Sequence, residues 1–167
     1  MSTTIRLFFL SLLAVSLSGC GFSLRGSTSA MDETVSVYLN AQNPSDATAV
    51  SIRQALENSG VSVVQSDSAD YTLALSAEQF SARPTTVNGR ARAAQYELVL
   101  AIEFSLQQAD TLLIPEETLA ANRSYFEDLA NISGSNEEQI LLRTEMRTEL
   151  VDKVIRRVAT AAENASP

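Results

Sequence analysis

The sequence predicts a single domain of the α/β (α+β) class, and three observations support this prediction. Apolar and polar residues alternate along several segments in the middle of the chain, as they do in half-buried strands. Two other segments, around residues 46–60 and 136–162, carry apolar residues at helical spacing. The 167 residues are enough to build one hydrophobic core, and no internal repeat divides them.

The beginning of the chain predicts export and lipidation. Arg6 precedes the apolar run 7–17, which is shorter than the roughly 20 residues of a membrane-spanning helix and has the length found in secretory signal peptides. The run ends at Leu17 and is followed by Ser-Gly-Cys. Residues 17–20 resemble the bacterial lipobox, and Cys20 is the only cysteine in the chain. We therefore expect residues 1–19 to be a lipoprotein signal peptide. Cys20 would then become the first residue and carry a diacylglycerol and an N-acyl chain such as palmitate. An ordinary signal peptide with a chance cysteine, or a short anchor, is the alternative.

The remaining chain is divided by its composition into three parts. Residues 20–33, which end in the polar stretch 27–33, are expected to be a lipidated tether that joins the fold a few residues later. Residues 34–162 form one α/β domain, in which every predicted strand and helix lies. Residues 163–167 are expected to form a frayed tail.

The domain opens with a predicted strand, helix and strand. Val35, Val37 and Leu39 alternate with polar residues, which indicates a half-buried strand. Ser45 or Asp46 is a suitable N-cap for the helix that follows, and Gly60 is typical of the position just past a helix end. Residues 61–65 then predict a short second strand.

Long antiparallel strands are predicted for the middle of the chain. Alternation starts at Tyr71 and extends as far as Phe80 or Ala82, and Pro84 is expected to end this strand. Asn88-Gly89 is typical of a tight hairpin turn, because both residues tolerate a positive φ angle.

The return strand has the most regular pattern in the sequence. Large apolar residues occupy every second position from Tyr96 to Leu106, which predicts one buried face. After a turn at residues 108–110, an extended segment continues to Phe126. Pro115 within this segment indicates an edge strand or a bulge, since proline has no backbone N–H to donate to a neighbouring strand.

The last predicted element is a helix over about residues 136–162. Ser135 and Glu138 fit a capping box at its start. Three arginines fall inside its apolar arc instead of opposite it: Arg143, Arg147 and Arg157. Either their aliphatic stems pack while the guanidinium groups reach water, or the helix is covered on more than one side, by the sheet and by a partner.

Composition excludes several classes of function. The chain has 20 acidic and 12 basic residues and a net charge of −8, so no nucleic-acid partner is expected. It contains no histidine, which excludes a histidine metal site, a Ser-His-Asp triad and a histidine general base. Acidic pairs such as Glu137-Glu138 suit a helix N-terminus better than a reaction. We therefore expect no enzyme, no metal site and no cofactor other than the lipids on Cys20.

Three arginines form a local positive cluster around the predicted hairpin tip, with no acidic residue between them: Arg83, Arg90 and Arg92. Guanidinium groups bind phosphates well, so the cluster is a candidate phosphate contact. The alternative is a set of solvated turn charges, or charges that protect a strand edge from aggregation.

Short motifs along the chain carry a family resemblance. Residues 20–26 read Cys-Gly-Phe-Ser-Leu-Arg-Gly. Further matches follow in the same order, at Tyr96-Glu97-Leu98, Leu113-Ile114-Pro115, Arg123-Ser124-Tyr125, Glu145-Met146 and Arg156-Arg157. Together they resemble the lipopolysaccharide-assembly lipoprotein family LptE, also called RlpB. Two departures are Gly134-Ser135, where some relatives carry a lysine, and the segment 90–94, which is longer than expected.

The resemblance implies a fold and a function. The fold would be two helices packed on one face of a mixed, mostly antiparallel sheet of about four strands. The function would be that of an outer-membrane lipoprotein on the periplasmic side, anchored by its lipids. It would insert at about 1:1 into a large β-barrel of the LptD type, act as plug and assembly factor, and help to deliver lipopolysaccharide to the outer leaflet. Gly21 agrees with this location, because an Asp after the lipidated cysteine would favour the inner membrane.

The same resemblance suggests roles for individual residues. The three tip arginines would contact lipid A phosphates or the acidic mouth of the barrel. Phe22 and Arg25 would pack on a partner or the membrane interface, unless Arg25 is only a linker charge. Arg123 and Tyr125 would form a partner-facing patch with Tyr96, unless Tyr96 is part of the core. The rival function is a free-standing envelope lipoprotein, either an accessory to a lipid-transport system or a peptidoglycan-associated protein.

Overall fold

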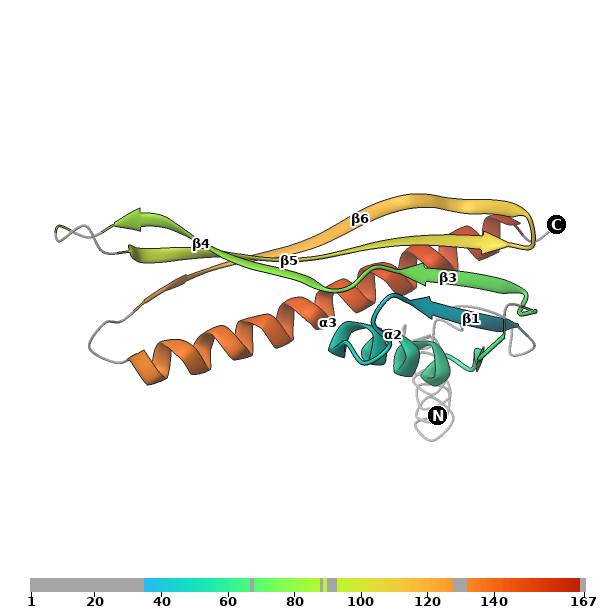
Figure 1. The fold of residues 1–167 in the computed structure, drawn as a ribbon, viewed down its shortest axis with the longest axis horizontal. Helices are drawn as coiled ribbons and strands as arrows, with labels where there is room; N and C mark the ends of the chain where they lie inside the picture. Colours follow the sequence, from blue (N-terminus) through green and yellow to red (C-terminus); the bar gives the residue numbers. More distant parts are fainter. Residues whose placement is uncertain (1–34, 67, 88, 90–92, 128–131, 166–167) are drawn as a thin grey trace, which may run out of the picture.

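The computed structural model describes residues 35–66, 68–87, 89, 93–127 and 132–165. Six strands and two helices follow one another in these residues, and Figure 1 shows their arrangement. In chain order they are β1 (Ser36–Ala41), α2 (Ala47–Asn58), β2 (Ser62–Val64), β3 (Tyr71–Leu75), β4 (Gln79–Val87), β5 (Ala93–Gln108), β6 (Thr111–Phe126) and α3 (Ile132–Ala165).

All six strands form one mixed sheet. Its order is β2-β1-β3-β5-β4, and β6 pairs with the other side of β5. β1 is parallel to β2 and β3, whereas every other pair is antiparallel. Both helices lie on one face of this sheet (Figure 1). The predicted class and the single helical face are therefore confirmed, although the sheet has six strands instead of about four.

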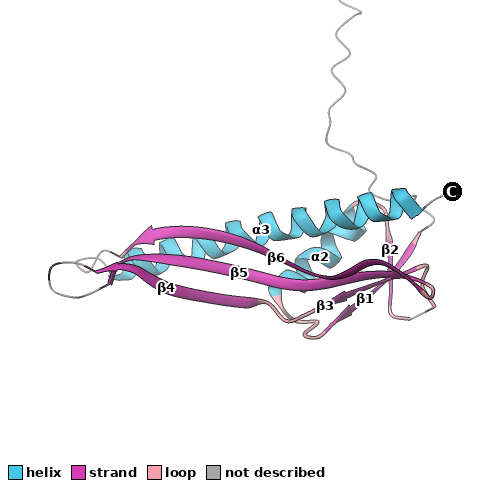
Figure 2. Cartoon of the chain, turned by 90° about the horizontal axis from the view of Figure 1, so that it is seen from above, coloured by secondary structure: helices cyan, strands magenta, loops and turns pink. Residues whose placement is uncertain are grey.

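The long strand β5 is the central element of the sheet. β3 pairs with its residues 104–108 and β4 with its residues 93–101, on the same side of β5. The molecule therefore has a wide end with β1, β2 and β3, and a narrow end with only β4, β5 and β6 beside α3 (Figure 2). We call the narrow end the arm.

The strand predicted to run from Tyr71 to Phe80 or Ala82 is in fact two strands in line. β3 ends at Leu75 and β4 begins at Gln79, and residues 76–78 break the ladder between them. The prediction that Pro84 ends the strand is wrong, since β4 continues to Val87. Proline is tolerated there because β4 is an edge strand, and the register shifts immediately after Pro84.

The second proline lies where the sequence indicated. β6 is an edge strand, and Pro115 falls in a bulge, because Ile114 faces Leu106 while Glu117 faces Phe104. The hairpin before it turns at Ala109, whose φ of 48° is left-handed and unfavourable for alanine. The hairpin between β4 and β5 is also confirmed as an antiparallel pair.

The helix ends agree with the sequence in α2 and differ in α3. Asp46 is the N-cap residue of α2, and Gly60 follows its C-terminal end with a φ of 85°. α3 begins at Ile132, so Ser135 lies buried inside the first turns and the predicted capping box is wrong. α3 also continues to Ala165, so residues 163–165 are helical and not frayed. No helix among the described residues combines the length and apolarity needed to span a membrane.

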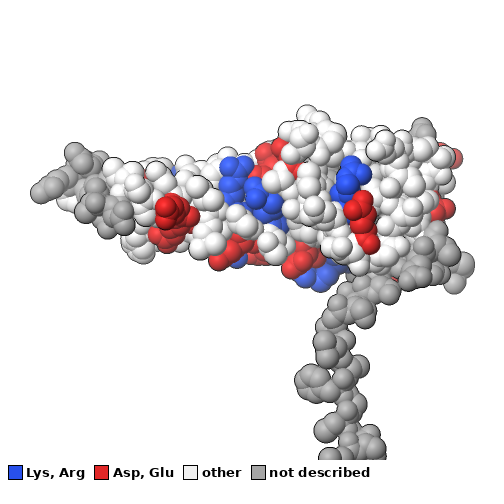
Figure 3. Space-filling model, turned by 90° about the horizontal axis from the view of Figure 1, so that it is seen from below, with Lys and Arg blue, Asp and Glu red and all other residues white. Residues whose placement is uncertain are grey.

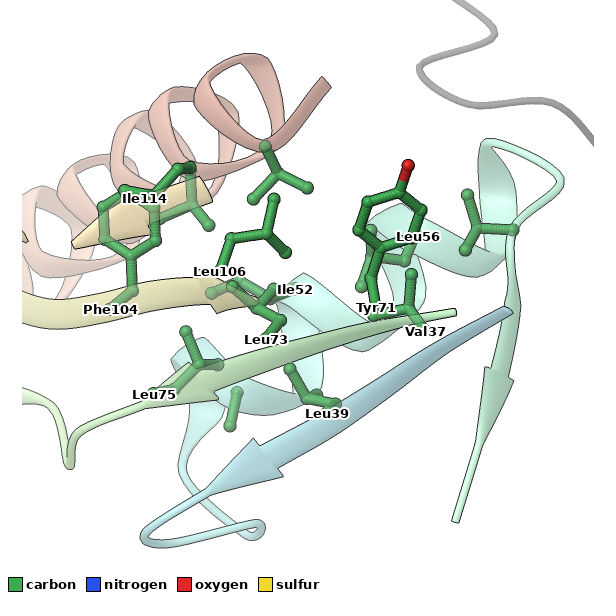
Figure 4. Packing of buried hydrophobic residues seen from close by; sticks show 14 of the residues in the cluster. Val37, Leu39, Ile52, Leu56, Tyr71, Leu73, Leu75, Phe104, Leu106 and Ile114 are labelled. Carbon is green, nitrogen blue, oxygen red and sulfur yellow. The ribbon is translucent and has the colours of Figure 1, made fainter. Parts of the chain in front are cut away.

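Two separate apolar clusters hold the helices on the sheet. The larger one lies at the wide end, where α2 and α3 cover β1, β3 and the adjoining part of β5 (Figure 4). Val37, Ile52 and Leu73 are completely buried in it. The smaller cluster lies in the arm between α3 and the sheet, and consists of Leu98, Leu100, Ala121, Tyr125, Met146 and Leu150.

Candidate functional site

An ion cluster centred on a buried carboxylate lies at the junction between β3 and β4. The Glu78 side chain is only 5% exposed and pairs with two arginines of α3. Arg143 donates from Nε to Glu78 Oε1 at 3.1 Å, and Arg147 donates from Nε to Oε2 at 3.0 Å. Thr48 of α2 donates its hydroxyl to Oε2 as well. One carboxylate thus joins the sheet to both helices, and we call these four residues the Glu78 cluster.

Hydrogen bonding keeps Glu78 ionised in this position. Burial alone raises the pKa of a carboxyl group, because it penalises the charged form. The hydrogen bonds from Arg147, Thr48 and Arg143 outweigh burial and lower the pKa of Glu78 to about 2. The backbone N–H of Glu78 also donates to Asp46 Oδ2 at 2.9 Å, so the N-cap residue of α2 binds the same turn. This arrangement supports the fold and carries no evident chemistry.

The arginines in the apolar arc of α3 therefore have intramolecular partners. Arg143 and Arg147 bind Glu78, and Arg157 donates to Glu117 of β6 at 3.0 Å. The Arg143 guanidinium also lies 4.5 Å from the centre of the Phe80 ring. Neither of the two explanations from the sequence included these ion pairs. Glu78 itself was missed, although it stands at the break in the alternating pattern of the strand.

A second ion cluster lies along the outer edge of β6. Glu149 of α3 accepts hydrogen bonds from Arg123 and Lys153, both at 2.7 Å. Hydrogen bonds from Lys153 and Arg123 lower the pKa of Glu149. We call Arg123, Glu149 and Lys153 the β6-edge cluster.

Arg123 is about a third exposed, and its contact with a partner stays a prediction. Tyr125 is instead only 7% exposed and belongs to the arm cluster. Its ring stacks on Tyr96 with centroids 5.5 Å apart. This position leaves little of Tyr125 for a partner, and it agrees with the alternative that Tyr96 packs in the core.

The predicted arginine cluster is described only in part. Arg83 lies on β4 with 71% of its side chain exposed, and its Nη2 is 2.5 Å from Glu97 on the adjacent strand. Glu97 comes after the three arginines in the sequence, so counting acids between them could not reveal this pairing. The other predicted site residues lie outside the described residues: Cys20, Phe22, Arg25, Arg90 and Arg92.

The described residues include no candidate metal site, and one face of the molecule carries charges of both signs. In these residues, no group of three or more His, Cys, Asp or Glu side chains could hold an ion. Basic and acidic side chains lie side by side on the face shown in Figure 3. The exposed large apolar residues are Phe126 at the end of β6, Ile132, Ile140 and Leu141 on α3, Val50 and Leu112.

The face of the sheet away from the helices carries mostly small and polar side chains. Residues of β5 at even positions from 98 to 106 are buried, so the odd positions and their cross-strand partners lie on the opposite face. Those partners on β6 include Thr118, Ala120, Asn122 and Ser124. No helix covers this face (Figure 2).

Comparison with known proteins gives consistent results. A family model described as LptE, lipopolysaccharide-assembly, matches residues 34–158. The LPS-assembly lipoprotein LptE of Photorhabdus laumondii is 25% identical over 161 residues, which cover 96% of this chain and 88% of that protein. The protein of the same name from Pectobacterium atrosepticum is 28% identical over 163 residues, covering 93% of this chain and 86% of that protein.

Two solved structures share the fold. Rare lipoprotein B from Shewanella oneidensis has a TM-score of 0.69 at 21% identity, covering 77% of this chain and 97% of that chain. Uncharacterized lipoprotein B from Nitrosomonas europaea has the same TM-score and identity, covering 87% of this chain and 94% of that chain.

Proposed function

Because this chain belongs to the LptE lipopolysaccharide-assembly family, we propose that it binds inside a large β-barrel of the LptD type. There it would act as plug and assembly factor, and assist delivery of lipopolysaccharide to the outer leaflet. The family consists of assembly lipoproteins without enzymatic activity, which agrees with the sequence-based expectation. The family match over residues 34–158 is the observation that carries this proposal.

The uncovered face of the sheet supports a position inside a barrel. The lumen wall of a membrane β-barrel is polar, so a protein that fills it needs a polar, hydrated surface. The small polar side chains of β6, such as Thr118 and Asn122, lie on a face that no helix covers.

The location and lipid anchor belong to the same proposal. Cys20 would carry the diacylglycerol and the N-acyl chain, and would hold the protein in the inner leaflet of the outer membrane. Two or more acyl chains give stable membrane binding, at about 0.8 kcal/mol per buried methylene. Mass spectrometry of the mature N-terminus tests this point, and an unmodified Cys20 would contradict it.

Lipopolysaccharide contact is proposed for the arm. Arg83 is exposed near its end, and Arg90 and Arg92 follow it closely in the sequence. Replacing all three with Glu should weaken lipopolysaccharide binding and make the envelope more permeable, because phosphates would face carboxylates. Unchanged binding and an intact barrier would exclude the arginines from this role.

The decisive experiment is a pull-down of the lipidated protein in mild detergent, with partners identified by mass spectrometry. We expect a complex of about 1:1 with one large β-barrel. Recovery of the protein alone, with peptidoglycan, or with a lipid-transport ATPase would favour the rival free-standing lipoprotein.

A further inference from the structure

The two long edges of the arm differ in how their backbone groups are satisfied. On β6, Lys153 donates from Nζ to the carbonyl oxygen of Ala120 at 3.0 Å, and Arg123 donates from Nη1 to that of Asn122 at 2.9 Å. Pro115 and its bulge interrupt the same edge farther along. Long cationic side chains and bulges are common means of preventing a further strand from pairing. The outward carbonyls of Ala120 and Asn122 are therefore already bonded, and we call this edge closed. On β4, by contrast, a proline and register shifts occur only from Pro84 onward.

The direction of the backbone groups on β4 follows from its neighbour. The N–H of Ser76 donates to the carbonyl oxygen of Glu103 at 2.9 Å, and the N–H of Glu103 donates to Ser76 Oγ, also at 2.9 Å. Both backbone groups of Glu103 thus point toward the side of β5 on which β3 and β4 lie. In an antiparallel ladder this direction alternates along the strand, so Ala101 and Val99 also point toward β4.

The register then identifies the outward groups. Gln79 faces Ala101 and Ser81 faces Val99, so Gln79 and Ser81 use their backbone groups to bind β5. The residues between and after them, Phe80 and Ala82, direct N–H and C=O away from the sheet. The outward carbonyls of Ala120 and Asn122 on the opposite edge agree with the same alternation.

β4 has an outer edge, on the side away from β5, and the position next to this edge is in line with β1. β1 pairs with β3 up to Ala41 and Leu75. Beyond that point, side chains substitute for a strand, since Gln42 Oε1 accepts from Ala77 N at 3.0 Å and Asp46 Oδ2 accepts from Glu78 N. No described strand pairs with β4 on this side (Figure 2). Two outward N–H groups remain before Pro84, which has none to offer.

The side chains beside the outer edge of β4 determine which kind of added strand could pair there. Phe80 is half-buried, and Arg143 lies over its ring with 42% of the arginine side chain exposed. Arg83 is the next exposed cation along β4. A strand added here would place an apolar side chain beside Phe80 and would be favoured by a carboxylate near Arg143. A second copy of this chain would instead bring its own Arg83 and Arg143 toward these cations.

We propose that the outer edge of β4 pairs with a short extended segment of the β-barrel partner, an apolar segment carrying an acidic residue. This inference rests on the proposed function, because it assigns the surface that the partner meets. A closed barrel has no free strand edge, so the segment comes from one of its loops or termini. Backbone pairing of this kind gives affinity, and alternate side chains give specificity.

The test uses the full-length lipidated protein expressed together with the barrel. A photocrosslinking amino acid replaces Gln79 or Ser81 at the β4 edge, or Asn122 at the β6 edge as the matched control on the same face of the sheet. Strand pairing predicts that the crosslinked partner residue shifts by two when the probe moves from Gln79 to Ser81. Scattered partner residues from Gln79 and Ser81, or crosslinking of Asn122 to the same partner segment, would overturn the proposal.

A backbone variant tests the hydrogen bonds themselves. Ala82→Pro removes one outward N–H and leaves the ladder with β5 intact, while Ala120→Pro removes an outward N–H from the closed edge. Ala82→Pro should reduce the crosslink from Gln79 at least fivefold, and Ala120→Pro should leave it unchanged. Hydrogen exchange of the unmodified protein gives the same information without a variant, since the Phe80 and Ala82 amides should become protected in the complex.

The outcomes separate the two proposals. If no barrel is recovered with the unmodified protein, the proposed function fails. If the barrel is recovered at about 1:1 without an ordered crosslink or amide protection, only the β4 pairing fails. Crosslinks between two copies of this chain would overturn the choice of partner.

Discussion

At the scale of single residues, Glu78 has the largest expected effect on stability. Its pKa of about 2 lies below the ordinary 4.5, so its contribution is complete above pH 4.5 and is lost as the pH falls from 4.5 toward 2. The difference between these two pKa values corresponds to at most about 3.5 kcal/mol. Glu78→Gln should therefore destabilise the protein by about 2 kcal/mol at pH 7 and make unfolding less dependent on pH in this range.

Denaturant unfolding at pH 7 and pH 3 measures this effect. Glu117→Gln is the matched control, because it breaks the Arg157 pair, which is one-third to one-half exposed. Exposed pairs contribute about 0–1 kcal/mol. Equal losses of stability in both variants would show that the Glu78 cluster is no stronger than a surface ion pair.

For Ala109 we predict a substitution that raises stability instead of lowering it. Its φ of 48° costs an alanine about 1 kcal/mol or more, and glycine accepts this angle without strain. Ala109→Gly should raise the free energy of unfolding by about 0.5 kcal/mol after the greater freedom of the unfolded chain is subtracted. Thermal unfolding would show a higher midpoint, and a lower one would mean that the turn gains nothing from glycine.

At the scale of elements, the two sides of α3 should respond differently to the same substitution. Leu150 is fully buried in the arm cluster, whereas Leu141 is 59% exposed on the same helix. Leu150→Ala should cost about 2–5 kcal/mol through the cavity it leaves. Leu141→Ala should change stability by no more than about 0.5 kcal/mol. Denaturant midpoints compare the two directly, and similar losses would contradict the burial described above.

The elements also show which parts of the fold could be predicted from sequence patterns. Strict alternation identified β5, and Pro115 identified an edge strand with a bulge, because both depend on local constraints. The split between β3 and β4 was missed, because it depends on Glu78 binding arginines 65 and 69 residues away. The start of α3 was also missed, since Ser135 satisfies the local capping pattern while lying inside the helix. Contacts distant in sequence thus decided where β3 ends and β4 begins.

The candidate site was less predictable than the fold for the same reason. Arg83 could be found as an exposed cation, but its partner Glu97 depends on the β4–β5 register. Tyr125 was expected on a surface and packs in the arm cluster, because its position alternates with that of Phe126, which is 69% exposed. Sequence motifs were enough to identify the family. Which side chains are exposed to a partner depends on strand register and packing, which the motifs do not give.

At the scale of the whole molecule, the two apolar clusters predict unequal stability. The wide end contains Val37, Ile52, Leu73 and many other buried residues, whereas the arm cluster has six. Regions with fewer buried contacts open more readily. Backbone amides of β4 should therefore exchange with solvent faster than those of β3. Hydrogen exchange measured by mass spectrometry would test this, and equal protection of both strands would show one cooperative unit.

β3 and β4 lie in line beside the single strand β5. The length of the arm can therefore change without a change in the wide end. Removing two residues at matched positions from each of β4, β5 and β6 would shorten the arm by about 7 Å and preserve which side chains face α3. The residues of β5 that pair with β3, 104–108, would keep their neighbours. Chains with this topology can therefore differ in the length of the arm while the wide end stays the same.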